Sequence, residues 1–354
     1  MPDATICHIT RIPVSIPTVS GMMPLTAALD VDEIRYVLWW HALQKVSWRL
    51  GEGLRRWGIR HYGSECNGLV PIWDERRILW QLGQVPKRRI AHFLWGEFGP
   101  LKHVAPYHRR GIKVVVSVHC SARRWDSVWL RPDGYANADR VVLTSDSQRP
   151  CVERTVPPER VTTILHGVAI GYFTPSPVRE PRSDRYRLLM MGNTERDHEF
   201  AARVAAKLPA EKFEWRIRTD SLERNHYMGV ASATLLPRLS DEQILAEYRQ
   251  ADVLALPMLD SAANNVILES MACGTPVMVN RVGGIPEYVN LECNFVMSNN
   301  RHVDEWVEKL LWLEQNRDVA ERLRPATRAW AEKFDWKLIA EDYRAMYRDV
   351  IARG

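Results

Sequence analysis

The sequence predicts an α/β fold built from two doubly wound, Rossmann-like domains that face each other across a cleft. Short apolar runs rich in β-branched residues alternate with amphipathic segments in both halves of the chain, as is typical of buried parallel strands joined by helices. The 354 residues suffice for two domains of ordinary size, and 46% of them are hydrophobic, which supplies ample core.

The expected strands are short and the helices follow them closely. Residues 113–119 (KVVVSVH) and 140–145 (RVVLTS) are β-branched, as buried strands are. In the second half, residues 187–193 (RLLMMGN) are predicted to form the first strand. A helix should follow it from about residue 196 to residue 208.

A proline-rich segment divides the chain. Residues 174–184 (TPSPVREPRSD) combine several prolines with mixed charge, and this composition predicts an interdomain linker. The expected domains are therefore residues 1–175 and residues 176–335, followed by a final segment at residues 336–354.

The composition argues against several classes of protein. No run of about 18 apolar residues occurs, and residues 1–20 lack the basic start and apolar block of a secretion signal. The six cysteines show no Cys-x-x-Cys pair or metal-ligand spacing, which favours reduced thiols and no zinc site. Phosphate-loop, serine-hydrolase and zinc-protease motifs are also missing. We therefore expect a cytoplasmic protein.

Net positive charge is concentrated in the first half of the chain. Residues 1–175 hold 23 of the 48 basic residues and only 15 of the 43 acidic ones. Within them, residues 36–58 interleave tryptophans with lysine and arginine. We favour an amphipathic helix packed on the sheet; a peripheral helix at the inner face of the membrane is the alternative. A nucleic-acid surface ranks last, because no recognised nucleic-acid motif accompanies the charge.

Residues 259–287 (LDSAANNVILESMACGTPVMVNRVGGIPE) carry the densest group of functional signals. A strand at residues 251–257 precedes them, Ser261 stands where a helix N-cap is expected, and Gly274 ends the helix. The helix N-terminus then points into the crevice at the carboxyl ends of the strands, where its amides and dipole favour a diphosphate. Glu269 lies two turns further on, where its carboxylate can accept hydrogen bonds from two ribose hydroxyls.

A further strand and a glycine turn follow this helix. Residues 275–279 (TPVMV) are predicted to form the strand, and the glycines of residues 283–287 (GGIPE) let the backbone approach a ligand closely. The segments ESMACGTPV and GGIPE resemble the donor-binding motif of glycosyltransferase family 4. That motif runs E-x7-E, then AxGxPV, then GGxPE, so the match is specific.

Weaker similarities to the same family occur in the right order around this motif. They are residues 138–147 (ADRVVLTSDS), 161–175 (VTTILHGVAIGYFTP), 239–257 (LSDEQILAEYRQADVLALP) and 334–351 (FDWKLIAEDYRAMYRDVI). The resemblance covers roughly residues 110–351. It implies a GT-B architecture in which the second domain holds the sugar donor, the first holds the acceptor, and the last helix crosses back to the first domain.

The resemblance implies a retaining, metal-independent glycosyltransferase of the hexosyltransferase type. It would move a sugar from a nucleotide diphosphate sugar, with no other cofactor, to a glycan, lipid-linked or small-molecule acceptor. The only Asp-x-Asp, at residues 30–32, is predicted to open a helix rather than to hold a metal-bound diphosphate. A catalytically silent GT-B scaffold subunit and a nucleotide-sugar epimerase or phosphorylase are the alternatives.

The expected diphosphate cations are missing from their usual positions. In the family an arginine follows the strand glycine, here Gly192, and a lysine comes a few residues later. This chain has Asn193 in the first place and the pair Asp197–His198 in the second. Arg196 is the nearest substitute for neutralising the leaving diphosphate. The other candidates are Arg216, Arg218, protonated His198, and the helix amides near Asn264 and Asn265.

The first glutamate of E-x7-E is replaced by Ser261. Its contacts with the donor sugar then pass to Asp260, Ser261 or Asn264, which alters the sugar that fits, or activity is lost. In the first domain, His119 ends a strand and resembles the family's histidine beside the donor sugar, and Gly21 stands in the place of a glycine pair. The expected donor set comprises Gly192, Asn193, Asp260, Ser261, Asn264, Asn265, Val266, Glu269 and Thr275, with His119 and Arg196 as catalytic residues and Gly21 on the acceptor side.

Overall fold

The computed structural model divides the chain into two compact units, Met1–His166 with Trp336–Gly354, and Gly167–Asp335. We call them unit 1 and unit 2. The structure describes residues 5–11, 20–36, 47, 72–84, 89–98, 101, 103–128, 135–177, 183–220 and 222–353. The interpretations offered for the tryptophan-rich segment 36–58 fall almost entirely outside these ranges.

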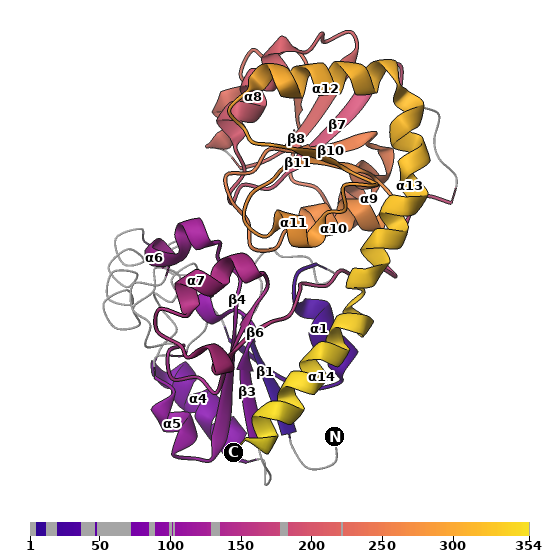
Figure 1. Ribbon diagram of the computed structural model, residues 1–354. Coiled ribbons are helices and arrows are strands. Elements are labelled where there is room, and N and C mark those ends of the chain that lie inside the picture. The colour runs from indigo at the N-terminus through magenta and orange to yellow at the C-terminus, as the bar shows by residue number, and fades with distance from the viewer. Residues whose placement is uncertain are drawn as a thin grey trace. The chain divides into compact units, whose positions relative to one another are not determined.

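Unit 1 contains a six-stranded parallel sheet (Figure 1). Its strand order is β2-β1-β3-β4-β5-β6, so the direction of winding reverses between β1 and β3. The strands are β1 (Thr5–Arg11), β2 (Asp32–Tyr36), β3 (Arg89–Phe93), β4 (Ile112–Val118), β5 (Arg140–Leu143) and β6 (Val161–Thr163).

Helices cover both faces of this sheet because successive strand residues point to opposite sides. On β4, Val114 and Val116 belong to one apolar cluster and Val115 to the other. The first cluster includes residues of α4 (Ile72–Gly83), α5 (Ala105–His108), α6 (Trp125–Val128) and α7 (Arg149–Val152). The second joins α1 (Met23–Leu29) to the final helix α14 (Trp336–Ala352), which therefore packs on the sheet of unit 1.

A buried polar network lies beneath α14. The hydroxyl of Tyr347 is 3.0 Å from Nε2 of His8 and 2.6 Å from Nδ1 of His92. The other ring nitrogens bond Thr26 (2.8 Å) and Ser117 (2.8 Å). Burial lowers the pKa of His8 to about 3 and lowers the pKa of His92 well below its usual value. Both rings are therefore neutral at physiological pH.

Unit 2 contains a second six-stranded parallel sheet, of order β12-β11-β10-β7-β8-β9. This is the doubly wound order of dinucleotide-binding domains, with the reversal between β7 and β10. The strands are β7 (Tyr186–Met191), β8 (Phe213–Arg218), β9 (Ala233–Leu235), β10 (Val253–Leu256), β11 (Val277–Asn280) and β12 (Phe295–Met297).

The helices of unit 2 alternate with these strands, and they are α8 (His198–Lys207), α9 (Asp241–Gln250), α10 (Asn265–Ala272), α11 (Ile285–Tyr288), α12 (Val303–Gln315) and α13 (Arg317–Ala331). A capping box on Ser240 starts α9, and the Asp197 side chain caps α8. The predicted class, two doubly wound α/β domains, is confirmed.

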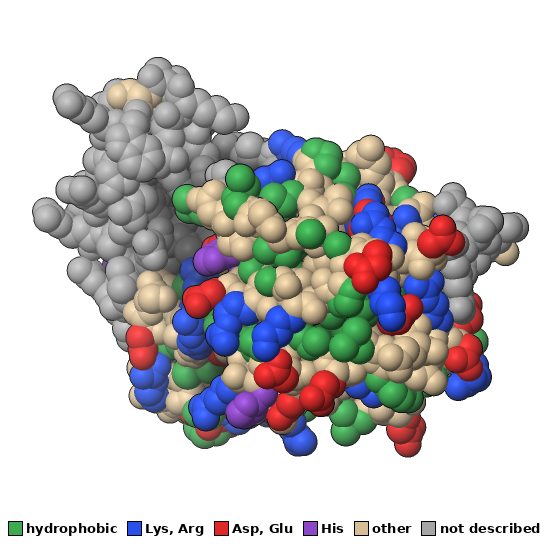
Figure 2. Space-filling model, turned by 90° about the horizontal axis from the view of Figure 1, so that it is seen from above, with side chains coloured by type: hydrophobic (Ala, Val, Ile, Leu, Met, Phe, Trp, Pro, Cys, Tyr) green, Lys and Arg blue, Asp and Glu red, His purple; other side chains and the backbone are tan. Residues whose placement is uncertain are grey.

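The surface of the described residues mixes charges of both signs. On the face seen in Figure 2, basic and acidic side chains are interspersed with apolar ones. Ion pairs such as Lys207–Asp304, at 2.5 Å, join opposite charges on α8 and α12. No helix among the described residues is long and apolar enough to cross a membrane.

Candidate functional site

The candidate site lies in unit 2, where the winding of the sheet reverses. The loops that leave β7 and β10 are fastened to each other there by backbone hydrogen bonds. The Asp197 amide donates to the Pro257 carbonyl (2.9 Å), and the Leu259 amide donates to the Glu195 carbonyl (2.8 Å). Glu195 sits at φ +59°, a left-handed conformation that is uncommon for a side-chain-bearing residue. These contacts hold Arg196 beside the carboxyl ends of β7 and β10, the edge at which ligands of such sheets bind.

The guanidinium of Arg196 packs against Gly192. A Cβ on Gly192 would lie 2.9 Å from Nη2 of Arg196, so a side chain there would displace the guanidinium from this position. Gly192 also has φ +91°, which favours glycine for a second reason. A cationic side chain therefore lies beside Gly192 in space, although the residue that directly follows Gly192 in the sequence is Asn193.

The hydrogen-bond partners of Arg196 are all neutral. Its nitrogens donate to the carbonyls of Met191 (3.1 Å) and Thr194 (2.6 Å) and to Oδ1 of Asn264 (3.3 Å). No ion pair involves it among the described residues. Burial lowers the pKa of Arg196 to about 10, against the opposing electrostatic influence of Tyr248, Glu269 and Glu195. Arg196 is therefore a cation at pH 7, positioned by dipoles and not neutralised by a bonded carboxylate.

Helix α10 begins beside this guanidinium. Its N-cap is Asn264, whose Oδ1 accepts from the Ile267 amide at 3.3 Å. The expectation that Ser261 caps the helix is wrong, because residues 260–263 stay non-helical and the helix starts at Asn265. The half-buried Asn265 and Val266 supply the first amides of the helix.

Glu269 lies one turn beyond Asn265 on the same helix. Its side chain is buried, with 6% of the residue exposed. Oε2 accepts a hydrogen bond of 2.7 Å from the hydroxyl of Tyr248 on α9. The sequence did not single out Tyr248, because a tyrosine on an amphipathic helix is indistinguishable from an ordinary core residue.

The segment before α10 is fixed by the glycine turn. The Gly284 amide donates to the Ser261 carbonyl (2.7 Å), and the Ser261 amide donates to Oδ1 of Asp260 (2.8 Å). A Cβ on Gly283 would lie 2.2 Å from Oδ1 of Asp260, so this turn needs a glycine to approach so closely. This contact explains the late start of α10. Asp260 and Ser261 are both buried in the segment that precedes α10.

The remaining polar candidates of this loop have structural partners. Oδ1 of Asn193 accepts from Thr219 (2.7 Å) and from the Asp220 amide (2.8 Å). His198 uses one ring nitrogen for the Tyr227 hydroxyl (2.8 Å) and the other for the Gly192 carbonyl (3.0 Å). Burial lowers its pKa, which argues against a protonated His198 as the diphosphate cation.

Two further candidates lie away from the helix start. Arg216 binds both oxygens of Glu247, at 2.5 and 2.6 Å, and a short contact with Glu214 (3.1 Å) completes an ion cluster. Thr275 is fully buried, and its hydroxyl donates to the Tyr248 carbonyl at 2.6 Å. Arg216 is thus engaged by acidic side chains, and Thr275 supports the Tyr248 backbone.

In unit 1, His119 follows β4 at the carboxyl end of the sheet. Its Nε2 donates to the Leu94 carbonyl at 2.7 Å, since a carbonyl can only accept. In the neutral ring Nδ1 is therefore the acceptor. The buried Glu97 accepts from the backbone amides of both His119 and Cys120 (2.6 Å) and so fixes this turn. Gly21 precedes α1 with φ +65°.

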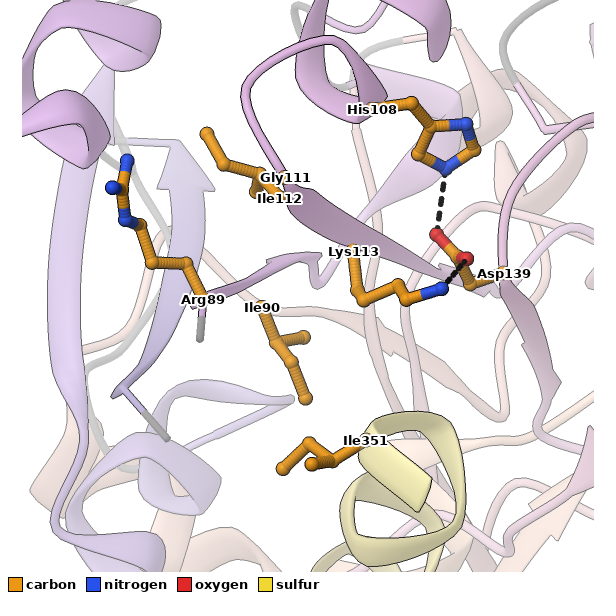
Figure 3. Close-up of a pocket in the computed structure, with 8 residues that line it drawn as sticks. All are labelled: Arg89, Ile90, His108, Gly111, Ile112, Lys113, Asp139 and Ile351. Carbon is orange, nitrogen blue, oxygen red and sulfur yellow. Dashed lines mark hydrogen bonds and ion pairs between the residues drawn. The ribbon is translucent and has the colours of Figure 1, made fainter. Parts of the chain in front are cut away.

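A pocket of about 300 Å³ in unit 1 lies at the opposite, amino ends of the strands (Figure 3). Asp139 there accepts from His108 (2.7 Å) and pairs with Lys113 (3.1 Å). The side chain of Arg89 points away from that group in Figure 3. Because ligands of parallel sheets bind at the carboxyl ends, and the cations here do not converge, this pocket is not a candidate active site.

No cluster of three or more potential metal ligands occurs among the described residues.

Two parallel Rossmann-like sheets along one chain define a GT-B-type fold, and solved structures agree. Sucrose-phosphate synthase from Thermosynechococcus elongatus superimposes with a TM-score of 0.72 at 15% identity, over 99% of this chain and 100% of that one. The Anabaena protein HepE in complex with UDP gives a TM-score of 0.69 at 12% identity, over 98% and 100%.

Residues 177–316, which lie in unit 2, match the family model of glycosyl transferases group 1. The D-inositol 3-phosphate glycosyltransferase of Thermobispora bispora is 28% identical over 244 residues, 61% of this chain and 57% of that protein. Its namesake from Saccharomonospora viridis is 30% identical over 126 residues, 35% of this chain and 29% of that protein. The chain thus matches less than two thirds of the length of either relative. The resemblance to glycosyltransferase family 4 is confirmed, whereas the consequence of Ser261 stays a prediction.

Proposed function

We propose that the protein is a retaining glycosyltransferase that takes its sugar from a nucleotide diphosphate sugar bound in unit 2. The observation that carries the proposal is the Arg196 guanidinium beside the start of α10, which neutral acceptors hold and which has no ion-pair partner among the described residues. A cation held by carbonyls and an amide oxygen, at the positive end of a helix, favours an anionic ligand.

Two relatives support this class of donor. HepE was solved in complex with UDP, and a pneumococcal O-GlcNAc transferase with 15% identity was solved with UDP and GlcNAc. In the present chain Arg196 and the amides of Asn265 and Val266 would bind the diphosphate, and Glu269 would bind the ribose hydroxyls. Asp260, Ser261 and Asn264 would face the sugar.

The chemistry needs no metal and no covalent nucleophile in this proposal. As the glycosidic bond breaks, negative charge builds on the departing diphosphate, and Arg196 with the α10 amides stabilises it. The acceptor hydroxyl forms the new bond to the anomeric carbon from the same face and loses its proton to the departing phosphate. Retention of configuration follows from the family resemblance.

Unit 1 would supply the acceptor side, with Gly21 near the acceptor and the Nδ1 acceptor of His119 near the transferred sugar. The relatives named D-inositol 3-phosphate glycosyltransferases make a phosphorylated polyol the first acceptor to test. A glycan or a lipid-linked acceptor is the alternative.

A thermal-shift panel of UDP, GDP, ADP, dTDP and CMP, with the wild type and Glu269→Ala, tests the proposal. At about 100 times the dissociation constant a ligand stabilises its protein by about 2.7 kcal/mol. One base should raise the melting temperature of the wild type, and the mutant should lose most of that shift without unfolding.

Three residues differ from the family's donor-site pattern, namely Asn193, Asp197 and Ser261. These differences favour a second candidate, a catalytically silent GT-B scaffold subunit. The same panel separates the two. A wild type that responds to none of the nucleotides would contradict the enzyme and support the scaffold. An epimerase or phosphorylase would instead convert the sugar nucleotide or sugar phosphate without an acceptor.

A further inference from the structure

Tyr248 and Glu269 form a buried donor–acceptor pair at the candidate site. The phenol hydroxyl donates to Oε2 of the carboxylate at 2.7 Å, across the contact between α9 and α10. The exposed fractions are 1% for Tyr248 and 6% for Glu269. A hydrogen bond to an ionised carboxylate in such surroundings is stronger than one between neutral groups.

The tyrosine is held rigidly at its other end. Its backbone carbonyl accepts from the Thr275 hydroxyl at 2.6 Å, and Arg324 donates to that same hydroxyl at 3.0 Å. The ring packs edge-on against Phe173, with centroids 6.0 Å apart. Burial and the neighbouring Glu269 raise the pKa of Tyr248 well above its usual value, so the hydroxyl keeps its proton and remains a donor.

Glu269 belongs to the helix that begins at the Arg196–Asn264 contact. Its carboxylate has about four acceptor positions, of which the Tyr248 hydroxyl takes one on Oε2. A charge-assisted bond of this kind restrains the orientation of the carboxylate. Two vicinal hydroxyls can donate together to a carboxylate only when its plane is correctly turned.

We propose that Tyr248 is a positioning residue, which orients Glu269 so that the site selects ribonucleoside over 2′-deoxyribonucleoside diphosphates. This inference rests on the proposed donor site. The Tyr248 hydroxyl bonds Glu269, whereas the guanidinium of Arg196 bonds other acceptors, so Tyr248 should influence the recognition of the ribose more than that of the diphosphate.

The test measures dissociation constants by calorimetry for UDP and 2′-deoxy-UDP, or for the corresponding pair of whichever base binds. The wild type should prefer the ribonucleotide by roughly tenfold or more, the usual effect of one charged hydrogen bond. In Tyr248→Phe this preference should fall severalfold, mainly through weaker binding of the ribonucleotide. The 2′-deoxy ligand should bind nearly as before.

Tyr227→Phe is the matched control, because Tyr227 is a buried tyrosine of the same unit whose hydroxyl bonds His198 instead. Its ribose preference should equal that of the wild type. Glu269→Asp is the second variant. Its shorter side chain moves the carboxylate away from the unchanged Tyr248 hydroxyl, so this variant should also show a smaller preference for the ribonucleotide. In the Glu269→Gln background, adding Tyr248→Phe should change the preference no further.

The outcomes separate the two proposals. A wild type that binds no nucleoside diphosphate would contradict the donor site itself, and this inference with it. A wild type that prefers ribonucleotides, together with a Tyr248→Phe protein that keeps the full preference, would overturn the role of Tyr248 and leave the donor site standing. A Glu269→Asp protein that keeps the full preference would contradict the binding of ribose by Glu269 as well.

Discussion

The guanidinium of Arg196 occupies the space that a side chain on Gly192 would fill. A Cβ there would lie 2.9 Å from Nη2 and 3.0 Å from Cζ and Nε of Arg196. The two residues are four apart in the sequence, and the left-handed Glu195 between them lets the loop fold back on itself. The position of the Arg196 guanidinium therefore depends on the absence of a side chain at residue 192.

Gly192→Ala should weaken nucleoside diphosphate binding by displacing this guanidinium. Gly229→Ala is the control, because Gly229 also has positive φ (+78°), but a Cβ added there would meet no atom within 4 Å apart from its chain neighbours. Each substitution should cost about 1 kcal/mol of unfolding free energy from backbone strain. Only Gly192→Ala should lose nucleotide affinity as well, measured by calorimetry; equal affinities in the two variants would contradict the packing argument.

Arg216→Gln should destabilise unit 2 without changing nucleotide affinity. Arg216 is held by Glu247 and Glu214. Removing it leaves the largely buried Glu247 carboxylate without this cation, whereas Glu214 keeps Arg185 and Arg187. A loss on the order of 3 kcal/mol is expected in a urea titration. If nucleotide binding fell while stability stayed unchanged, Arg216 and not Arg196 would be the phosphate cation.

Acid should destabilise unit 1 through its buried histidines. The folded pKa of His8, about 3, lies below the unfolded value of 6.5, so the unfolded chain binds the proton more tightly. Stability is thus complete above pH 6.5 and falls as the pH drops toward 3. Between pH 6.5 and pH 5 the tighter proton binding of His8 in the unfolded chain should lower the free energy of unfolding by about 2 kcal/mol. Urea titrations of wild type and His8→Asn check this, because the variant should show a shallower loss; identical slopes would exclude His8 as the cause.

The sequence predicted the fold well because buried parallel strands leave a local signal. Residues 187–193 were expected as a strand and β7 spans Tyr186–Met191; a helix was expected at about 196–208 and α8 spans His198–Lys207. The fold class follows from such alternation, which depends only on residues near in sequence.

The site was less predictable because its details depend on distant contacts. The N-cap moved from Ser261 to Asn264, since the turn at Gly283 and Gly284 holds the Ser261 backbone outside the helix. The bond between Tyr248 and Glu269 joins two helices that the sequence separates. Neither contact leaves a periodic pattern.

We propose that Arg196 takes the place of the phosphate cations that the family resemblance leads us to expect after Gly192. The most direct test compares a nucleoside, its monophosphate and its diphosphate in calorimetric titrations of wild type and Arg196→Gln. We predict that the affinity gained from the diphosphate, about 10-fold or more for a charged contact, largely disappears in Arg196→Gln while nucleoside binding is unchanged. An undiminished preference for the diphosphate in Arg196→Gln would contradict it.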